Sequence, residues 1–287
     1  MRNPLTYGVI AAFGCVALAG FSIDRSGTEI LSNGVERVVT IGAGDFFFQA
    51  PDTVMSGIVR IDIANGGKDL HHVQLVRLDA GRTVQELLDL VSAGAPLPAW
   101  AHMVGGPNAP VPGATASATL DLEPGSYGII CWVHGADGVP HFMKGMFKGL
   151  VVVPAPIETG VLPKADAEMV LDDYSFTFSK PIEAGRRTIR VRNAAAQPHE
   201  VVIVRLAPNA KVTDVLAWLR EQKGPPPGAP IGGATFIAHD EENYVTADFA
   251  PGRYGLICFV PDASDGRPHI AHGMVSEFEV ATSVAAQ

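Results

Sequence analysis

The sequence has few cysteines and few basic residues. Three cysteines occur in 287 residues, and 21 Lys and Arg stand against 30 Asp and Glu, which gives a formal net charge of -9. Binding to phosphate backbones requires clustered positive charge, so we expect no nucleic-acid partner. Charged residues make up only 18% of the chain and apolar residues 47%, a balance typical of folded proteins. The length is enough for two domains of ordinary size.

Several catalytic motifs are missing as well. The sequence contains no G-x-S-x-G elbow, no P-loop and no H-E-x-x-H motif. The stretch "GAGD" at residues 42–45 precedes an aromatic strand pattern and not a helix, so it is no dinucleotide-binding fingerprint. These absences exclude the commonest hydrolase, nucleotide-binding and zinc-protease signatures.

The N-terminus carries an apolar stretch, "MRNPLTYGVIAAFGCVALAGFS", which is too short to indicate a membrane span with confidence. It ends in the small-x-small pattern Ala17-Leu18-Ala19, which predicts a signal peptide at residues 1–19. We therefore expect a periplasmic or secreted protein, with an uncleaved N-terminal membrane anchor as the alternative. A lipoprotein cysteine at Cys15 is disfavoured by the residues before it. Cleavage leaves Cys131 and Cys258, a pair that would normally suggest a disulfide in an oxidising compartment.

A long internal repeat runs through the rest of the chain. "GSYGIIC" at residues 125–131 matches "GRYGLIC" at 252–258, an offset of 258 − 131 = 127. "HHVQLVRL" at residues 71–78 matches "HEVVIVRL" at 199–206, an offset of 199 − 71 = 128. A period this long indicates duplicated domains and not a solenoid.

Both halves show the same order of predicted elements. Alternating apolar residues with Gly and Asn between them indicate half-buried strands, interrupted by one helix and a Pro/Gly-rich loop. Thr83 followed by Glu86 predicts a capping box at the first helix. We predict an all-β fold of two tandem Greek-key β-sandwich domains, each with one inserted helix. The predicted units are domain 1 at residues 38–153, a linker at 154–167 and domain 2 at 168–281.

Four polar or sulfur positions recur in register in the two halves. They are His71 with His199, Cys131 with Cys258, His141 with His269, and Met146 with Met274. A Cys thiolate and two imidazoles form a trigonal plane that suits copper, and a weak axial Met thioether completes a type 1 copper site. The sequence therefore predicts one type 1 copper site in each domain.

The loops that carry these residues resemble the cupredoxin, or blue copper, family. "GSYGIIC…PHFMKGM" and "GRYGLIC…PHIAHGM" are similar to the family pattern Gly-x-Tyr-x-x-x-Cys, then His, then Met. The long Cys-to-His loop and the His-x-x-x-Gly-Met ending look most like copper nitrite reductases and multicopper oxidases. Glu200 and His72 depart from the Asn that usually follows the first His ligand. The resemblance also implies that the loop histidines, His141 and His269, reach the surface through an apolar patch where electrons enter.

These observations predict single-electron transfer with a redox partner protein of the cell envelope, and we allow for a homo-oligomer. The alternatives are a two-domain copper oxidase or nitrite-reductase-like enzyme, with an extra site assembled between subunits from His102 or His239, and a non-redox copper carrier. Catalytic coppers in the resembling enzymes use histidines beside the type 1 Cys. Here no His-x-His pair occurs, and the cysteines are flanked by Ile, Trp and Phe. Enzyme activity is therefore left open but not favoured.

Two further alternatives concern the sites themselves. If only one holds copper, we expect the first to be degenerate, because His72, His134 and Met143 offer competing donors. A disulfide between Cys131 and Cys258 would need their Cα atoms within about 7 Å. Because the two cysteines occupy equivalent positions in separate domains, only an unusual docking of the loops would permit that bond.

Overall fold

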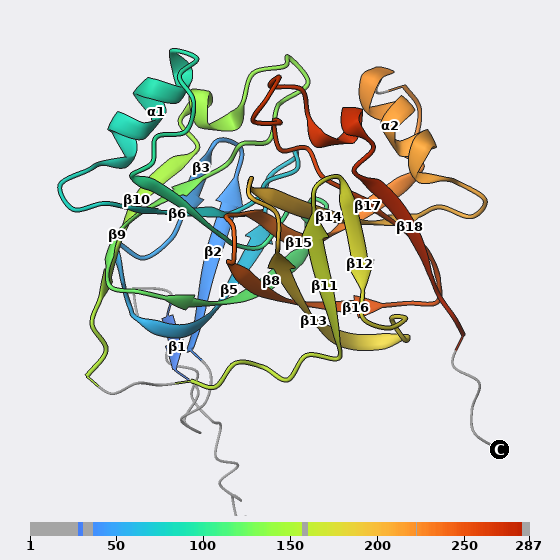
Figure 1. Cartoon of the computed structure of the whole chain (residues 1–287), viewed down its shortest axis with the longest axis horizontal. Coiled ribbons are helices and arrows are strands. Elements are labelled where there is room, and N and C mark those ends of the chain that lie inside the picture. The colour runs from blue at the N-terminus through green and yellow to red at the C-terminus, as the bar shows by residue number, and fades with distance from the viewer. Residues whose placement is uncertain (1–27, 31–36, 157–159, 222, 283–287) are drawn as a thin grey trace, which may run out of the picture.

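The computed structural model describes residues 28–30, 37–156, 160–221 and 223–282 (Figure 1). The predicted signal peptide at residues 1–19 lies outside the described residues. Among the described residues, none of the helices has the length and apolar character needed to cross a membrane.

In the described part of the chain, the strands form two nine-stranded sheets. The first sheet runs β1 (Thr28–Ile30), β2 (Arg37–Gly44), β5 (Gly57–Asn65), β8 (Thr115–Leu122), β16 (Glu242–Phe249), β13 (Gly185–Asn193), β11 (Ala167–Asp172) and β12 (Ser175–Phe178), with β3 (Phe47–Gln49) beside β2. The second sheet runs β18 (Val275–Val280), β17 (Gly252–Ile257), β14 (His199–Leu206), β15 (Gly228–Ile237), β7 (Ala101–Gly105), β6 (Gln74–Leu78), β9 (Gly125–Ile130), β10 (Phe147–Val153) and β4 (Thr53–Met55).

The strand pairings repeat from one half to the other. β2 and β5 are parallel, as are β11 and β13, while β6 lies between β7 and β9 just as β14 lies between β15 and β17. The helices α1 (Val84–Ser92) and α2 (Val212–Glu221) lie at the same end of the sheets, on opposite sides of the molecule (Figure 1). The predicted capping box is present, because Glu86 N donates to Thr83 Oγ1 and Thr83 N donates to Glu86 Oε2. The all-β prediction with one helix in each half is confirmed.

Both sheets continue from one half into the other, a feature that the sequence analysis did not predict. Ala118 of β8 pairs with Val245 of β16, and Pro107 pairs with Ala234. Each pair joins repeat-equivalent positions, since 245 − 118 = 127 and 234 − 107 = 127. A two-fold axis places equivalent residues opposite each other, so the halves are related by a pseudo-two-fold axis through this junction.

The strands β7 and β15 at this junction fall in the segments that the sequence analysis assigned to Pro/Gly-rich loops, and that assignment was wrong. Gly106, which directly follows β7, and Gly233 of β15 allow neighbouring segments to approach closely. A Cβ on Gly106 would lie 2.2 Å from Val73 O, and one on Gly233 would lie 1.9 Å from Val201 O. Both glycines also have positive φ angles, 138° and 133°, which other residues rarely adopt. Glycine here permits strand pairing where we expected irregular chain.

Each half packs its own apolar core between the two sheets. The alternation along β5, for example, buries Val59, Ile61 and Ile63 completely. Cys131 belongs to the core cluster of the first half, and Cys258 belongs to that of the second. Both cysteines therefore lie at the end of a dense apolar core, with no exposure to solvent.

Candidate metal centres

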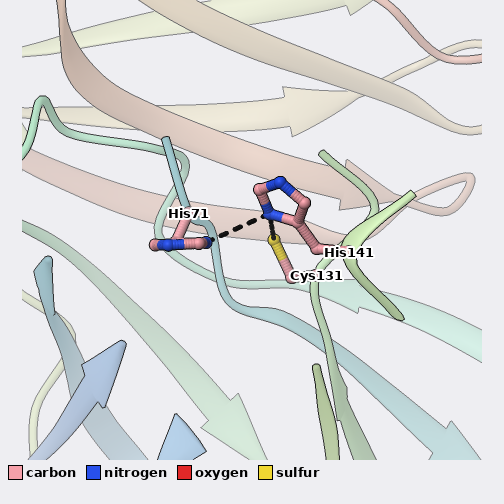
Figure 2. A group of neighbouring side chains, drawn as sticks. All are labelled: His71, Cys131 and His141. Atoms are coloured by element: carbon pink, nitrogen blue, oxygen red, sulfur yellow. Dashed lines mark hydrogen bonds between the residues drawn. The ribbon is translucent and has the colours of Figure 1, made fainter. Parts of the chain in front are cut away.

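In the first half, His71, Cys131 and His141 converge (Figure 2). His71 lies just before β6, Cys131 directly follows β9, and His141 begins the 3-10 turn η1 (His141–Lys144). The Nδ1 atoms of His71 and His141 are 3.1 Å apart, and Cys131 Sγ lies 3.6 Å from His141 Nδ1. All three side chains are fully buried, and one donor atom from each lies within 4.8 Å of the others.

The second half brings together the equivalent residues. His199 begins β14, Cys258 directly follows β17, and His269 begins the 3-10 turn η2 (His269–His272). Cys258 Sγ lies 3.9 Å from His199 Nδ1 and 3.3 Å from His269 Nδ1. These side chains are also fully buried. In both halves the Nδ1 atom of the histidine in the 3-10 turn faces the thiol.

The two methionines follow these loops closely. Met146 and Met274 are fully buried and belong to the same core clusters as Cys131 and Cys258 respectively. The carbonyl of each methionine accepts a hydrogen bond from the backbone N–H of its cysteine, at 3.2 and 3.3 Å. In each half the loop therefore begins at the cysteine and ends at the methionine, and a backbone hydrogen bond joins these two residues.

Backbone hydrogen bonds and one glycine shape each loop. In the first half, His141 N donates to Val133 O at 2.8 Å, and Met146 N donates to His141 O at 3.0 Å. Gly145 lies between η1 and Met146 with φ 100°, a left-handed conformation that glycine adopts readily. The second half repeats this arrangement with His269, Val260, Met274 and Gly273.

His71, which precedes β6, and His199, which begins β14, are called the strand histidines below. The Nε2 atom of each faces a carboxylate. His71 Nε2 lies 3.3 Å from Asp45 Oδ1, and His199 Nε2 lies 3.2 Å from Asp173 Oδ1. A carboxylate in this place favours the proton on Nε2, which leaves the Nδ1 lone pair directed toward the cysteine. We did not single out Asp45 and Asp173 from the sequence, although their offset, 173 − 45 = 128, matches the repeat.

Burial sets the protonation states. It lowers the pKa of His141 and of His269 to about 4, with the neighbouring imidazole adding to the effect in each site. It raises the pKa of the Cys131 thiol to about 12, and that of Cys258 upward as well. At neutral pH the imidazoles are therefore neutral and able to bind a metal, while a metal ion would have to displace the thiol proton.

The loop histidines do not reach the surface, and the implication drawn from the family resemblance was wrong on this point. Both side chains are fully buried. The Phe46 ring packs edge-on against His141 at 5.0 Å between centroids, and Tyr174 packs in the same way against His269 at 5.6 Å. These aromatic residues occupy equivalent positions, and both have positive φ angles. An aromatic side chain thus lies over each loop histidine.

The competing donors of the first loop point elsewhere. His134 is exposed, and Met143 is 54% exposed. His72 is buried, but its Nε2 accepts a hydrogen bond from Trp132 N at 2.9 Å. Away from the sites, His102 pairs with Asp79, and His239 lies beside Asp240. Within the described part of the chain, none of these histidines joins a cluster of three metal-binding side chains.

The disulfide alternative is contradicted. Cys131 and Cys258 are both free and buried, each next to its own pair of histidines. A thiol with two imidazole nitrogens is a donor set that suits copper, because the sulfur favours Cu(I) and the imidazoles also accept Cu(II). The residues present therefore fit a copper ion in both halves.

Comparisons with known proteins returned structural neighbours only. No family model and no curated protein matches the chain. Solved structures that match it include a multicopper oxidase, with 16% identity over 90% of this chain and 94% of that one and a TM-score of 0.27. A copper nitrite reductase from Nitrosomonas europaea matches with 16% identity, 86% and 95% coverage and a TM-score of 0.26. Auracyanin from Roseiflexus castenholzii matches with 24% identity, 40% and 95% coverage and a TM-score of 0.29.

TM-scores of this size do not carry the assignment, which rests on the strand order and the donor sets. Both halves have the Greek-key sheets and the His-Cys-His cluster that the sequence patterns predicted. On these grounds the chain is an all-β protein with two cupredoxin-like domains, and each domain has a candidate metal centre.

Proposed function

We propose that the chain is an exported copper-binding protein with a type 1 copper site in each half. We further propose that it transfers single electrons in exchange with a redox partner protein of the cell envelope. The observation that carries the copper proposal is the repetition of one buried His-Cys-His arrangement at equivalent places in both halves. Copper would supply the one-electron change between Cu(I) and Cu(II).

The proposed ligands are the thiolates of Cys131 and Cys258 and the Nδ1 atoms of the four site histidines. These histidines are His71, His141, His199 and His269. Met146 and Met274 are proposed as the weak axial ligands. Complete burial excludes water, and the carboxylates of Asp45 and Asp173 hold the strand histidines in one orientation. A ligand set held by a rigid core limits rearrangement when the ion changes its oxidation state.

Copper loading followed by visible and EPR spectroscopy tests this function. We expect two coppers per chain and an intense thiolate-to-copper absorption band. Cys131→Ser and Cys258→Ser should each remove one copper and about half of the band, since each removes one of two thiolates. A colourless copper-loaded wild type would overturn the type 1 assignment.

Two measurements separate electron transfer from the alternatives. Reversible oxidation and reduction without loss of copper supports the electron-transfer role, whereas ready release of copper to an acceptor supports a carrier. Nitrite reduction or phenol oxidation, together with a third copper per chain, would favour an enzyme.

A further inference from the structure

Three buried polar residues connect the two candidate metal centres. His72, Asn108 and Glu200 have exposed fractions of only 4%, 2% and 3%. Burying polar groups costs free energy unless each finds a hydrogen-bond partner, and a buried carboxylate is among the most costly. Asn108 and Glu200 satisfy part of that requirement through each other, at the junction between the halves.

His72 and Glu200 occupy equivalent positions, each directly after a strand histidine of a site. His72 Nε2 accepts a hydrogen bond from Trp132 N at 2.9 Å, and Glu200 Oε1 accepts one from Phe259 N at 3.0 Å. Trp132 and Phe259 directly follow the two site cysteines. Each side chain therefore connects the segment that carries the strand histidine of its site to the cysteine loop of the same site. We call these two hydrogen-bonded connections the ties.

Asn108 joins these two ties. Its Nδ2 donates to Glu200 Oε2 at 2.9 Å. The residue before it, Pro107, accepts a hydrogen bond through its carbonyl from Val73 N at 3.1 Å, so the segment that carries His72 runs alongside that of Asn108. Because His72 Nε2 already accepts from Trp132, the imidazole has its Nδ1–H left to donate to the Asn108 carbonyl oxygen. The Asn108 carbonyl oxygen accepts from Ala109 N at 2.8 Å and has a second lone pair for the imidazole, while Nδ2 donates to Glu200.

The pseudo-two-fold axis explains why one half alone supplies this link. Asn108 directly follows Pro107, whose pairing with Ala234 lies on the axis. The position equivalent to Asn108 is Thr235, since 235 − 108 = 127. Thr235 is equally buried, but within the described chain its hydroxyl donates to Val73 O and Gly106 O and makes no hydrogen bond with Glu200 or His72. Thr235 is thus a matched control for Asn108.

We propose that His72, Asn108 and Glu200 form a buried link that positions both cysteine loops together and thereby couples the two metal centres. Asn108 is a positioning residue for both sites although it contacts none of the proposed ligands. Replacing it with an apolar residue leaves an imidazole and a carboxylate without their shared partner inside the protein, and both must then rearrange. The part of the inference that concerns metal binding rests on the proposed function.

Amide hydrogen exchange in the metal-free protein tests the link without copper. We expect Asn108→Leu to accelerate exchange of both the Trp132 and Phe259 backbone N–H groups by about tenfold or more. Thr235→Val should leave both rates unchanged. Acceleration at Phe259 alone, or at neither amide, in a folded Asn108→Leu protein would overturn the link. Should Asn108→Leu fail to fold, Asn108→Ser tests the same expectation with a smaller polar side chain.

A cross-site variant makes the test sharper. His72→Phe removes the acceptor for Trp132 N, so exchange at Trp132 must rise whether or not a link exists. The link predicts that exchange at Phe259, in the other site, rises as well. An unchanged rate at Phe259 would show that the two ties are independent and would refute the coupling.

Copper titration of single-site proteins then tests the consequence for metal binding. In Cys131→Ser and Cys258→Ser backgrounds, we expect Asn108→Leu to raise the copper dissociation constant of the remaining site by about 10- to 100-fold in each case. Thr235→Val should change neither constant. An effect at only one site would contradict the coupling. If the wild type binds no copper, the proposed function fails, while the exchange experiment still decides the link.

Discussion

The loop histidine is held differently in the two halves. His269 Nε2 lies 3.1 Å from Gln197 Oε1, whereas the buried Nε2 of His141 has no hydrogen-bond partner within the described chain. The residue equivalent to Gln197 is Asp69, whose nearest carboxylate oxygen is 3.7 Å from His141 Nε2. The repeat has therefore kept the proposed ligands and changed the residues behind them. We infer that the second site is the better organised of the two.

The surroundings of the second site are also more polar. Tyr174 donates from its hydroxyl to Asp262 at 2.5 Å, where the first half has Phe46 and Gly135. Hydrogen bonds from Ser264, Tyr174 and Gln197 hold the pKa of Asp262 well below its usual range. Asp262 is therefore an anion at neutral pH, with an oxygen 3.7 Å from His269 Nε2. This negative charge favours the more positive state of a metal ion bound in the second site.

The largest predicted effect is that of Gly67→Ala on the first site alone. A Cβ on Gly67 would lie 2.5 Å from both His71 Nε2 and Asp45 Oδ1, so the new methyl group must displace at least one of these two side chains. We expect copper affinity of the first site to fall by about 100-fold, the upper range for losing an orienting partner of a ligand. Copper titration in the Cys258→Ser background measures this. The second half already has Ala195 at the equivalent position, so Ala195→Gly should leave its affinity unchanged.

Gln197→Ala should make the second site resemble the first. It leaves His269 Nε2 without its amide partner, and we expect about a tenfold loss of copper affinity. Titration in the Cys131→Ser background gives the value. The matched change Asp69→Ala should have a smaller effect on the first site, because no hydrogen bond is lost there. Equal losses in the two sites would contradict the comparison.

Asp262→Asn removes a charge beside the second site and keeps the size of the side chain. We expect the reduction potential of the second site to rise by on the order of tens of millivolts, since the oxidised ion loses electrostatic stabilisation; 59 mV corresponds to tenfold for one electron. Redox titration followed by the absorption band measures this shift. The first site, with Gly135 at the equivalent position, serves as an internal reference whose potential should stay unchanged.

The smallest predicted effect concerns the helices. Thr83→Ala removes the side chain that caps α1, and we expect the free energy of unfolding to fall by about 1 kcal/mol. Denaturant unfolding of the metal-free protein measures this loss. Thr83→Ser, which keeps a hydroxyl at the cap, should restore most of the stability. An unchanged stability in Thr83→Ala would show that α1 is held by packing alone.

Much of each candidate site could be predicted from the sequence because the repeat preserves the proposed ligands while other residues change. His141 and His269 stood out against His134 and Met143 for that reason, and the structure places the first two beside their cysteines. Asp45 and Asp173 recur equally well, but carboxylates are common on surfaces, and nothing in their local pattern suggested contact with a histidine. Asn108 has no counterpart of its own type, so the comparison of halves could not reveal it.

The junction between the halves was harder to predict for a different reason. β15 contains three glycines and a proline, β7 ends at Gly105 and is followed by Gly106 and Pro107, and the pairing of these strands depends on partners far away in the sequence. The local sequence pattern favours loops for such segments. Glycine has no side chain, which weakens the strand signal in the sequence and also permits neighbouring strands to pair closely. The strand β2 was also missed, although from Val39 onward its buried residues alternate with less buried ones.

The pairing of β8 with β16 has a consequence for the engineering of this chain. If the chain were cut within residues 154–167 and the halves were separated, β8 and β16 would each expose backbone hydrogen-bonding groups to solvent. Because the present junction joins equivalent residues, a free half carries the edge that could pair with a second copy of itself in nearly the same register. The two halves are thus arranged as the two subunits of a symmetric dimer would be, but joined in one chain. The second half has the more polar surroundings at its candidate metal centre, and the first half supplies Asn108 at the junction.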